Sequence, residues 1–95
     1  MDDFFAAPPF KPAEALVQLK RQLRELHALA ERGPGFELRG QAVIELAAQE
    51  QSIEAKLARR PARTPEWTRH ILKNSADVRR FVEAVKAQLT RWSDE

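Results

Sequence analysis

The residues best suited to chemistry lie between positions 56 and 74, in the stretch KLARRPARTPEWTRHILKN. Residues 56–80 hold eight Lys/Arg against two Asp/Glu, whereas residues 1–55 hold six against nine. Guanidinium groups make paired hydrogen bonds to phosphate or carboxylate oxygens, and tryptophan can stack on a nucleic-acid base. We therefore predict anion or nucleic-acid contacts at five positions of this window: Arg59, Arg60, Arg63, Arg69 and Lys73.

This basic window has two interpretations. If residues 59–63 form the loop that enters the last helix, their guanidinium groups surround the N-terminus of that helix, where free N–H groups attract anions. Alternatively, the loop is simply solvated. Trp67 lies at helical spacing from Ile71, which favours a core position for this tryptophan rather than a ligand contact.

Residue patterns typical of enzymes and metal sites do not occur in the sequence. Cysteine is absent, which excludes disulfides, thiolate ligands and a cysteine nucleophile. His27 and His70 fall in two different predicted helices without paired spacing, and both are expected to be boundary residues. We predict no catalytic residue, no metal site and no cofactor.

Apolar residues near both ends of the chain form the second candidate site. Three aromatic residues lie in a proline-rich segment, MDDFFAAPPFKP, which we predict to be a flexible tail over residues 1–11. These residues either cover the core or dock on a partner, and Trp92 either joins the core or is shared with a second copy. The predicted interaction surface is Phe4, Phe5, Phe10 and Trp92.

Two segments have the apolar spacing of amphipathic helices. Residues 12–32 carry leucines at intervals of three and four, start with a proline and end at GPG, which predicts a helix with a firm stop. Residues 65–92 start after Thr64 with another proline and continue with apolar residues at the same intervals, with a possible kink near Asn74.

The segment FELRGQAVIEL and the residues after it allow two structures. Apolar residues and Gly40 occupy every even position from 36 to 48, whereas the charged and amide side chains are all at odd positions. This alternation is typical of a half-buried strand, and it favours a hairpin of residues 36–48 and 52–59. The many Ala, Gln and Glu residues favour a helix instead.

The resulting prediction is a single α+β domain over residues 12–95, in the order helix, β-hairpin, helix, with both helices on one face of a small antiparallel sheet. The alternative is a three-helix bundle. The open edges of a two-stranded sheet favour a homodimer in which the hairpins join into a four-stranded sheet. We therefore predict a non-enzymatic protein that acts by protein–protein association.

The alternative function is nucleic-acid binding through residues 56–80, and an acidic protein is a further possible partner of that window. No membrane partner is expected, because no run of about 18 apolar residues occurs. The N-terminus is acidic, and its apolar run is broken by Pro8 and Pro9, which is unlike a signal peptide. We expect a cytoplasmic location.

Overall fold

The computed structural model describes residues 10–93. Within this range the chain forms two helices and one five-stranded sheet. The elements in chain order are α1 (Pro12–Arg24), β1 (Leu29–Arg32), β2 (Gly35–Leu38), β3 (Gln41–Ala48), β4 (Ile53–Ala58), β5 (Trp67–Leu72) and α2 (Ser75–Ser93).

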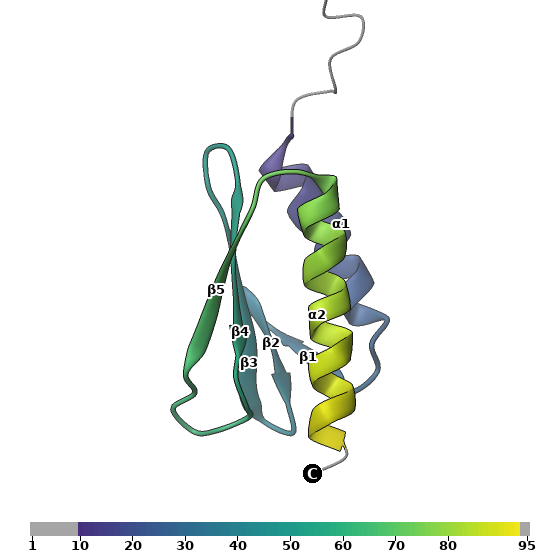
Figure 1. Ribbon diagram of the computed structural model, residues 1–95, viewed down its shortest axis with the longest axis vertical. Helices are drawn as coiled ribbons and strands as arrows, with labels where there is room; N and C mark the ends of the chain where they lie inside the picture. Colours follow the sequence, from purple (N-terminus) through teal and green to yellow (C-terminus); the bar gives the residue numbers. More distant parts are fainter. Residues whose placement is uncertain (1–9, 94–95) are drawn as a thin grey trace, which may run out of the picture.

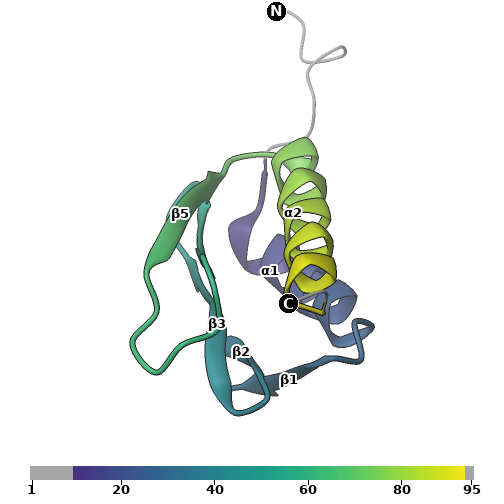
Figure 2. The same ribbon diagram turned by 60° about the horizontal axis from the view of Figure 1, so that its bottom comes forward.

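The sheet is a meander in which every strand pairs antiparallel with the next strand of the chain, in the order β1-β2-β3-β4-β5. Both helices lie on the same face of the sheet and pack beside each other (Figures 1 and 2). The predicted α+β class and the helix–sheet–helix order are confirmed, and the three-helix bundle is wrong.

The strand interpretation of residues 41–58 agrees with the observed pairing. In the β3–β4 hairpin, Ile44 lies opposite Leu57 and Leu46 opposite Ala55, and all four side chains are buried. The chain reverses at residues 49–52, where the Gln49 N–H donates a hydrogen bond to the Ser52 carbonyl oxygen over 2.7 Å. Here the alternation of side chains prevails over the helix propensity of Ala, Gln and Glu.

The predicted first arm of the hairpin, residues 36–48, is not one strand but two. Arg39 and Gly40 both have positive φ, 55° and 85°, and they separate β2 from β3. Two consecutive positive φ angles are the requirement of the tight two-residue turn that joins twisted antiparallel strands. The even-numbered pattern continues through this turn, so periodicity alone does not reveal it.

The first predicted helix, residues 12–32, is too long. Helix α1 ends at Arg24, and Leu29–Arg32 forms β1, in which Leu29 pairs with Leu38 of β2. Gly33, with φ 54°, and Pro34 therefore form the β1–β2 turn rather than a helix cap. Leu26 and Ala30 fit a helical stripe in the sequence, but pairing with β2 gives residues 29–32 a partner for their main-chain groups.

The last predicted helix, residues 65–92, contains a strand and a shorter helix. Residues 67–72 form β5 against β4, and α2 starts at Ser75. Asn74 caps α2, because its side-chain oxygen accepts a hydrogen bond from the Asp77 N–H over 2.8 Å. Thr64 and Pro65, which predict a helix start, lie instead in the β4–β5 loop.

The core lies between the helices and the inner face of the sheet. Its largest fully buried side chains include Phe36 from β2, Leu19 from α1 and Phe81 from α2. The pairing of β2 with β3 shifts at Val43, so that Val43 and Ile44 are both fully buried. Phe10 packs against this core, whereas Phe4 and Phe5 lie outside the described residues.

Gly35 marks the closest approach of β2 to β3. A Cβ atom at this position would overlap the carbonyl oxygen of Ile44. The backbone there has no positive φ, so the requirement for glycine comes from space and not from conformation.

Candidate functional site

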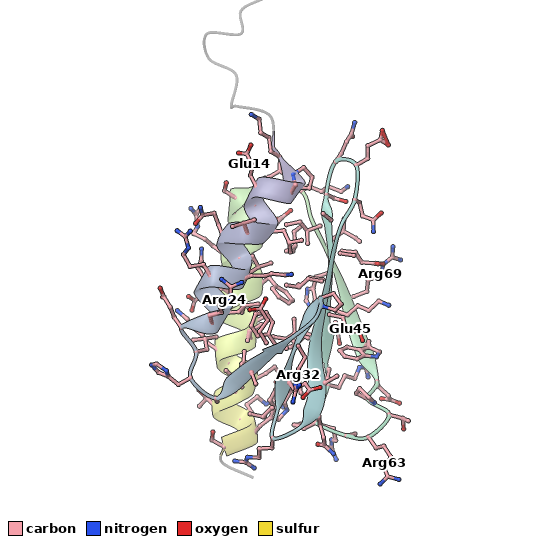
Figure 3. All side chains as sticks on the ribbon, turned by 180° about the vertical axis from the view of Figure 1, so that it is seen from behind. Glu14, Arg24, Arg32, Glu45, Arg63 and Arg69 are labelled. Carbon is pink, nitrogen blue, oxygen red and sulfur yellow. The ribbon has the colours of Figure 1, made fainter. Side chains whose placement is uncertain are left out.

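The outer face of the sheet, which no helix covers, carries equal numbers of opposite charges. Its ion pairs join Arg69 to Glu54 over 2.5 Å and Arg32 to Glu37 over 3.5 Å. Glu45 lies directly opposite Lys56 in the β3–β4 register. Figure 3 shows Glu45 and Arg69 on the side of the sheet away from the helices. A face on which three carboxylates alternate with three cations gives little attraction to a polyanion.

The outer edge of β5 has unpaired main-chain groups. The Arg59 N–H bonds the Glu66 carbonyl oxygen at 2.9 Å, which makes these two residues a hydrogen-bonded pair of the β4–β5 ladder. Such pairs alternate along antiparallel strands. Thr68, His70 and Leu72 therefore direct their main-chain groups toward β4. The main-chain groups of the other three residues, Trp67, Arg69 and Ile71, point away from the sheet.

One large apolar side chain is exposed at this edge. Ile71 is 39% exposed, and within residues 10–93 the only other exposed large apolar side chain is Val17 on α1. Trp67, which lies four residues before Ile71 and on the same outer face of the sheet, is half-buried. The run of unpaired main-chain groups ends after β5, because the Lys73 N–H donates a hydrogen bond to the Asp77 carboxylate over 2.9 Å.

The opposite edge of the sheet, β1, is shielded. It is only four residues long, and two of its residues form ion pairs. Arg24 at the end of α1 makes two hydrogen bonds to Glu31, of 2.6 and 3.2 Å, which lower the pKa of that carboxyl below its usual range. Short length and charge are the usual protection of an edge strand.

The edge geometry corrects the predicted dimer arrangement. The two outer sides of the β3–β4 hairpin are already paired, with β2 on one side and β5 on the other. Two hairpins therefore cannot join into a four-stranded sheet. In the described part of the chain, the free edges are those of β1 and β5.

The predicted anion-contact residues do not form one surface. Arg59, Arg60 and Arg63 lie in the β4–β5 loop, whereas Lys73 follows the other end of β5, a strand about 20 Å long. Arg69 lies between them and is paired with Glu54. The expected arrangement, in which the arginine loop surrounds the N-terminus of the last helix, is wrong, because β5 separates the two.

The β4–β5 loop, which carries these arginines, instead lies beside the β2–β3 turn and the last turn of α2 at one end of the molecule (Figure 1). We name these three segments together the basic end. A pocket of about 340 Å³ lies between them. Arg60 and Trp92, predicted separately as an anion contact and an interaction residue, line it together. The full lining is Leu38, Arg39, Gln41, Arg60, Pro61 and Trp92.

A larger hollow, of about 790 Å³, lies along α2 beside Gln22 of α1. Its lining includes Arg79, Glu83 and Lys86, which follow one stripe of the helix. Lys86 and Glu83 pair with each other over 3.4 Å. This surface has the mixed charge of a solvated helix face, so its size alone does not make it a binding site.

The histidines occupy unrelated positions. His27 is exposed between α1 and β1, and His70 contacts Phe81 edge to face, with 5.3 Å between the ring centroids. Within residues 10–93, no group of three or more His, Cys, Asp or Glu side chains is placed to hold a metal ion.

Asp77 is expected to make α2 sensitive to acid. The Lys73 N–H hydrogen bond, together with Arg80, lowers the pKa of its carboxyl. Such a group contributes stability above its unfolded pKa, and this contribution is lost as the pH falls through its folded pKa. We expect Asp77→Asn to lower the free energy of unfolding at pH 7, with the difference from the unmodified chain fading below about pH 4.

Urea unfolding monitored by circular dichroism between pH 7 and pH 3 measures this effect. Asn74→Ala is the matched control, because it removes the uncharged cap of the same helix. It is expected to cost about 0.5–2 kcal/mol at every pH in this range. A cost of Asp77→Asn that stays constant with pH would contradict the assignment.

No helix in residues 10–93 has the length and apolar character needed to cross a bilayer. No protein-family model matches the chain, and comparisons with curated proteins and with solved structures find no match either. Its function must therefore be argued from the β5 edge and the basic end.

Proposed function

We propose that this protein is non-enzymatic and acts by protein–protein association, as a homodimer in which the β5 strands of two copies pair antiparallel. The observation that carries the proposal is the open edge of β5, six residues long, with Ile71 exposed beside it. An added strand satisfies unpaired main-chain groups, and side chains on the joined face supply specificity.

One two-fold register uses all three outward-facing residues. It places Arg69 opposite Arg69 of the second copy and Trp67 opposite Ile71 of the second copy, with the same contact repeated by symmetry. Each of these residue pairs exchanges two main-chain hydrogen bonds in an antiparallel ladder. Registers shifted by two residues bring one outward-facing residue opposite a position beyond the open stretch, so they satisfy fewer groups.

The side chains of this register are self-complementary except at its centre. An aromatic residue opposite a β-branched residue is a favourable cross-strand pair, and the two-fold axis makes two such pairs. The two Arg69 guanidiniums meet at the axis, but each is bound to the Glu54 of its own chain. Added salt screens the remaining repulsion. We therefore expect the dimer to persist, or to strengthen, as the salt concentration rises.

The test compares Ile71→Lys with Val17→Lys by sedimentation equilibrium at micromolar concentrations. The first variant removes both Trp–Ile pairs and places a lysine at the edge, and it is expected to weaken dimerisation at least tenfold. Val17 is a matched control because it is also apolar and exposed, at 55%, but lies on α1. Its substitution should leave the dimer intact.

Circular dichroism of both variants checks that the fold is retained. A single-chain mass for the unmodified protein at up to about 100 μM would overturn the proposal. Equal dissociation by both lysine variants would also overturn it, because the effect would then not belong to β5.

Nucleic-acid binding through residues 56–80 is the second candidate, and the basic end is the observation that favours it. Arg59, Arg60 and Arg63 share one exposed loop there, to which α2 adds Arg91. The neutral outer face of the sheet offers no continuation for a long strand. Phosphate contacts weaken steeply with added salt, which is opposite to the behaviour expected of the dimer. Titration with single-stranded oligonucleotides that carry or lack a 5′-phosphate tests this candidate.

A further inference from the structure

We infer that the pocket at the basic end binds a nucleoside monophosphate, in which a sugar joins a phosphate monoester to a flat ring. This site is independent of the proposed dimer. It lies in the turns and the helix end at one end of the molecule, away from the hydrogen-bonding edge of β5.

Charge is the first reason for this ligand class. Among residues 10–93, the charged and amide side chains of the lining are Arg39, Arg60 and Gln41, and none of these residues contributes a carboxylate. Neither arginine takes part in the six ion pairs of the described residues. Two guanidiniums and an amide are hydrogen-bond donors of the kind that the oxygens of a phosphate monoester accept.

Size and the apolar wall are the second reason. A volume of about 340 Å³ exceeds what a bare phosphate needs and lies in the range of small-molecule pockets. The remaining lining is Leu38, Pro61 and Trp92. This apolar wall, to which the largely buried Trp92 adds its small exposed part, provides contact for a flat ring that a sugar joins to the phosphate.

The pocket is built on fixed elements. Arg39 belongs to the tight β2–β3 turn, and Trp92 is 8% exposed because it joins the core. The β4–β5 loop is closed at its base by the Arg59–Glu66 hydrogen bond. The amide of Gln88 on α2 reaches the Arg59 carbonyl oxygen at 3.5 Å. The main chain therefore needs little ordering on binding, so the entropic cost falls mainly on the exposed side chains of Arg39 and Arg60.

A competing explanation follows from the helix dipole. The pocket adjoins the C-terminal end of α2, which carries partial negative charge. Arg39 and Arg60 would then serve only to offset that charge. In that case, removing either arginine lowers stability, and no phosphate compound binds.

The experiment titrates the full chain with adenosine 5′-monophosphate, adenosine and inorganic phosphate at low salt, following backbone and indole signals by NMR. We expect adenosine 5′-monophosphate to shift the signals of Arg39, Gln41 and Trp92, and to bind more tightly than either fragment. Arg39→Ala and Arg60→Ala should each weaken binding about tenfold or more. Arg79→Ala, an exposed arginine on the first turns of α2, is the matched control and should change little.

Single-stranded oligonucleotides with and without a 5′-phosphate separate a free nucleotide from a strand terminus as the source of the phosphate. A preference for the 5′-phosphorylated strand supports the site, with a terminus as its occupant. Binding of both strands equally, without binding of the mononucleotide, would replace the inference by general nucleic-acid binding. Absence of any shift, or equal weakening by Arg79→Ala, would overturn it. Ile71→Lys should retain binding, so failure of the dimer does not affect this test.

Discussion

Replacing Gly35 with alanine is expected to cause the largest loss of stability of any substitution considered for this fold. The new methyl group would overlap the carbonyl oxygen of Ile44, which is main chain in the centre of the sheet and cannot rotate away. Strands β2 and β3 would have to separate, and Phe36, 1% exposed, would move with them. We expect a loss of about 4 kcal/mol or more, against a total of about 5–14 kcal/mol for a chain of this length.

The matched control for this substitution is Gly40→Ala. At Gly40 the requirement for glycine comes from conformation and not from space, because its φ is 85° but no atom lies near a Cβ built on it. Alanine there should cost only about 1–2 kcal/mol, the strain of a left-handed residue. Urea denaturation of both variants measures the two costs. A smaller loss for Gly35→Ala than for Gly40→Ala would contradict the close approach of β2 to β3.

Truncation of Phe81 is expected to have the second largest effect. This side chain is 2% exposed, and it holds α2 against the edge strand through its contact with His70. Phe81→Ala should lower the free energy of unfolding by about 3–5 kcal/mol, because the ring leaves a cavity that the helix cannot fill. The loss should be accompanied by faster amide hydrogen exchange along β5, because its sheet partner within the described residues of the same chain is β4 alone.

The control for Phe81 is Val17→Ala, at the most exposed large apolar residue of the described chain. It should change stability by no more than about 0.5 kcal/mol. Chemical denaturation gives both values, and hydrogen exchange gives the location of the loosening. Equal costs for the two substitutions would show that Phe81 does not act as a core residue.

How far the fold could be predicted depended on whether local pattern and tertiary pairing agreed. They agreed at residues 41–58, where alternation identifies strands and the structure pairs them. They disagreed at Leu29–Arg32, which extends the helical stripe of α1 in the sequence. Only the presence of β2 alongside makes this segment a strand.

The strand β5 shows why the last helix was overestimated. Trp67 and Ile71 are four residues apart, a spacing that places them on one face of a helix and also on one face of a strand. In the structure Ile71 is exposed, whereas a helical stripe would have buried it. The aromatic and β-branched residues of WTRHIL were the available signal for a strand.

The basic end could not be assembled from the sequence. Arg39, Arg60 and Trp92 come from three segments that are far apart in the sequence, and only the folded chain brings them together. The sequence indicates Arg60 and Trp92, but for different roles. Arg39 was missed because its position in a turn with positive φ has no strong signature when the residue is arginine rather than asparagine or aspartate.

The nearest-neighbour pairing of the sheet also bears on the kinetics of folding. Each strand pairs with a strand that is adjacent in the chain, so the sheet is built from hairpins whose short loops have a small entropic cost of closure. The packing of α1 on α2 is different, since it joins the first element to the last. During synthesis α1 emerges before its partner helix exists. Until that helix is made, α1 exposes its core-facing apolar residues in addition to Val17. Completion of the core therefore depends on α2, Ser75–Ser93.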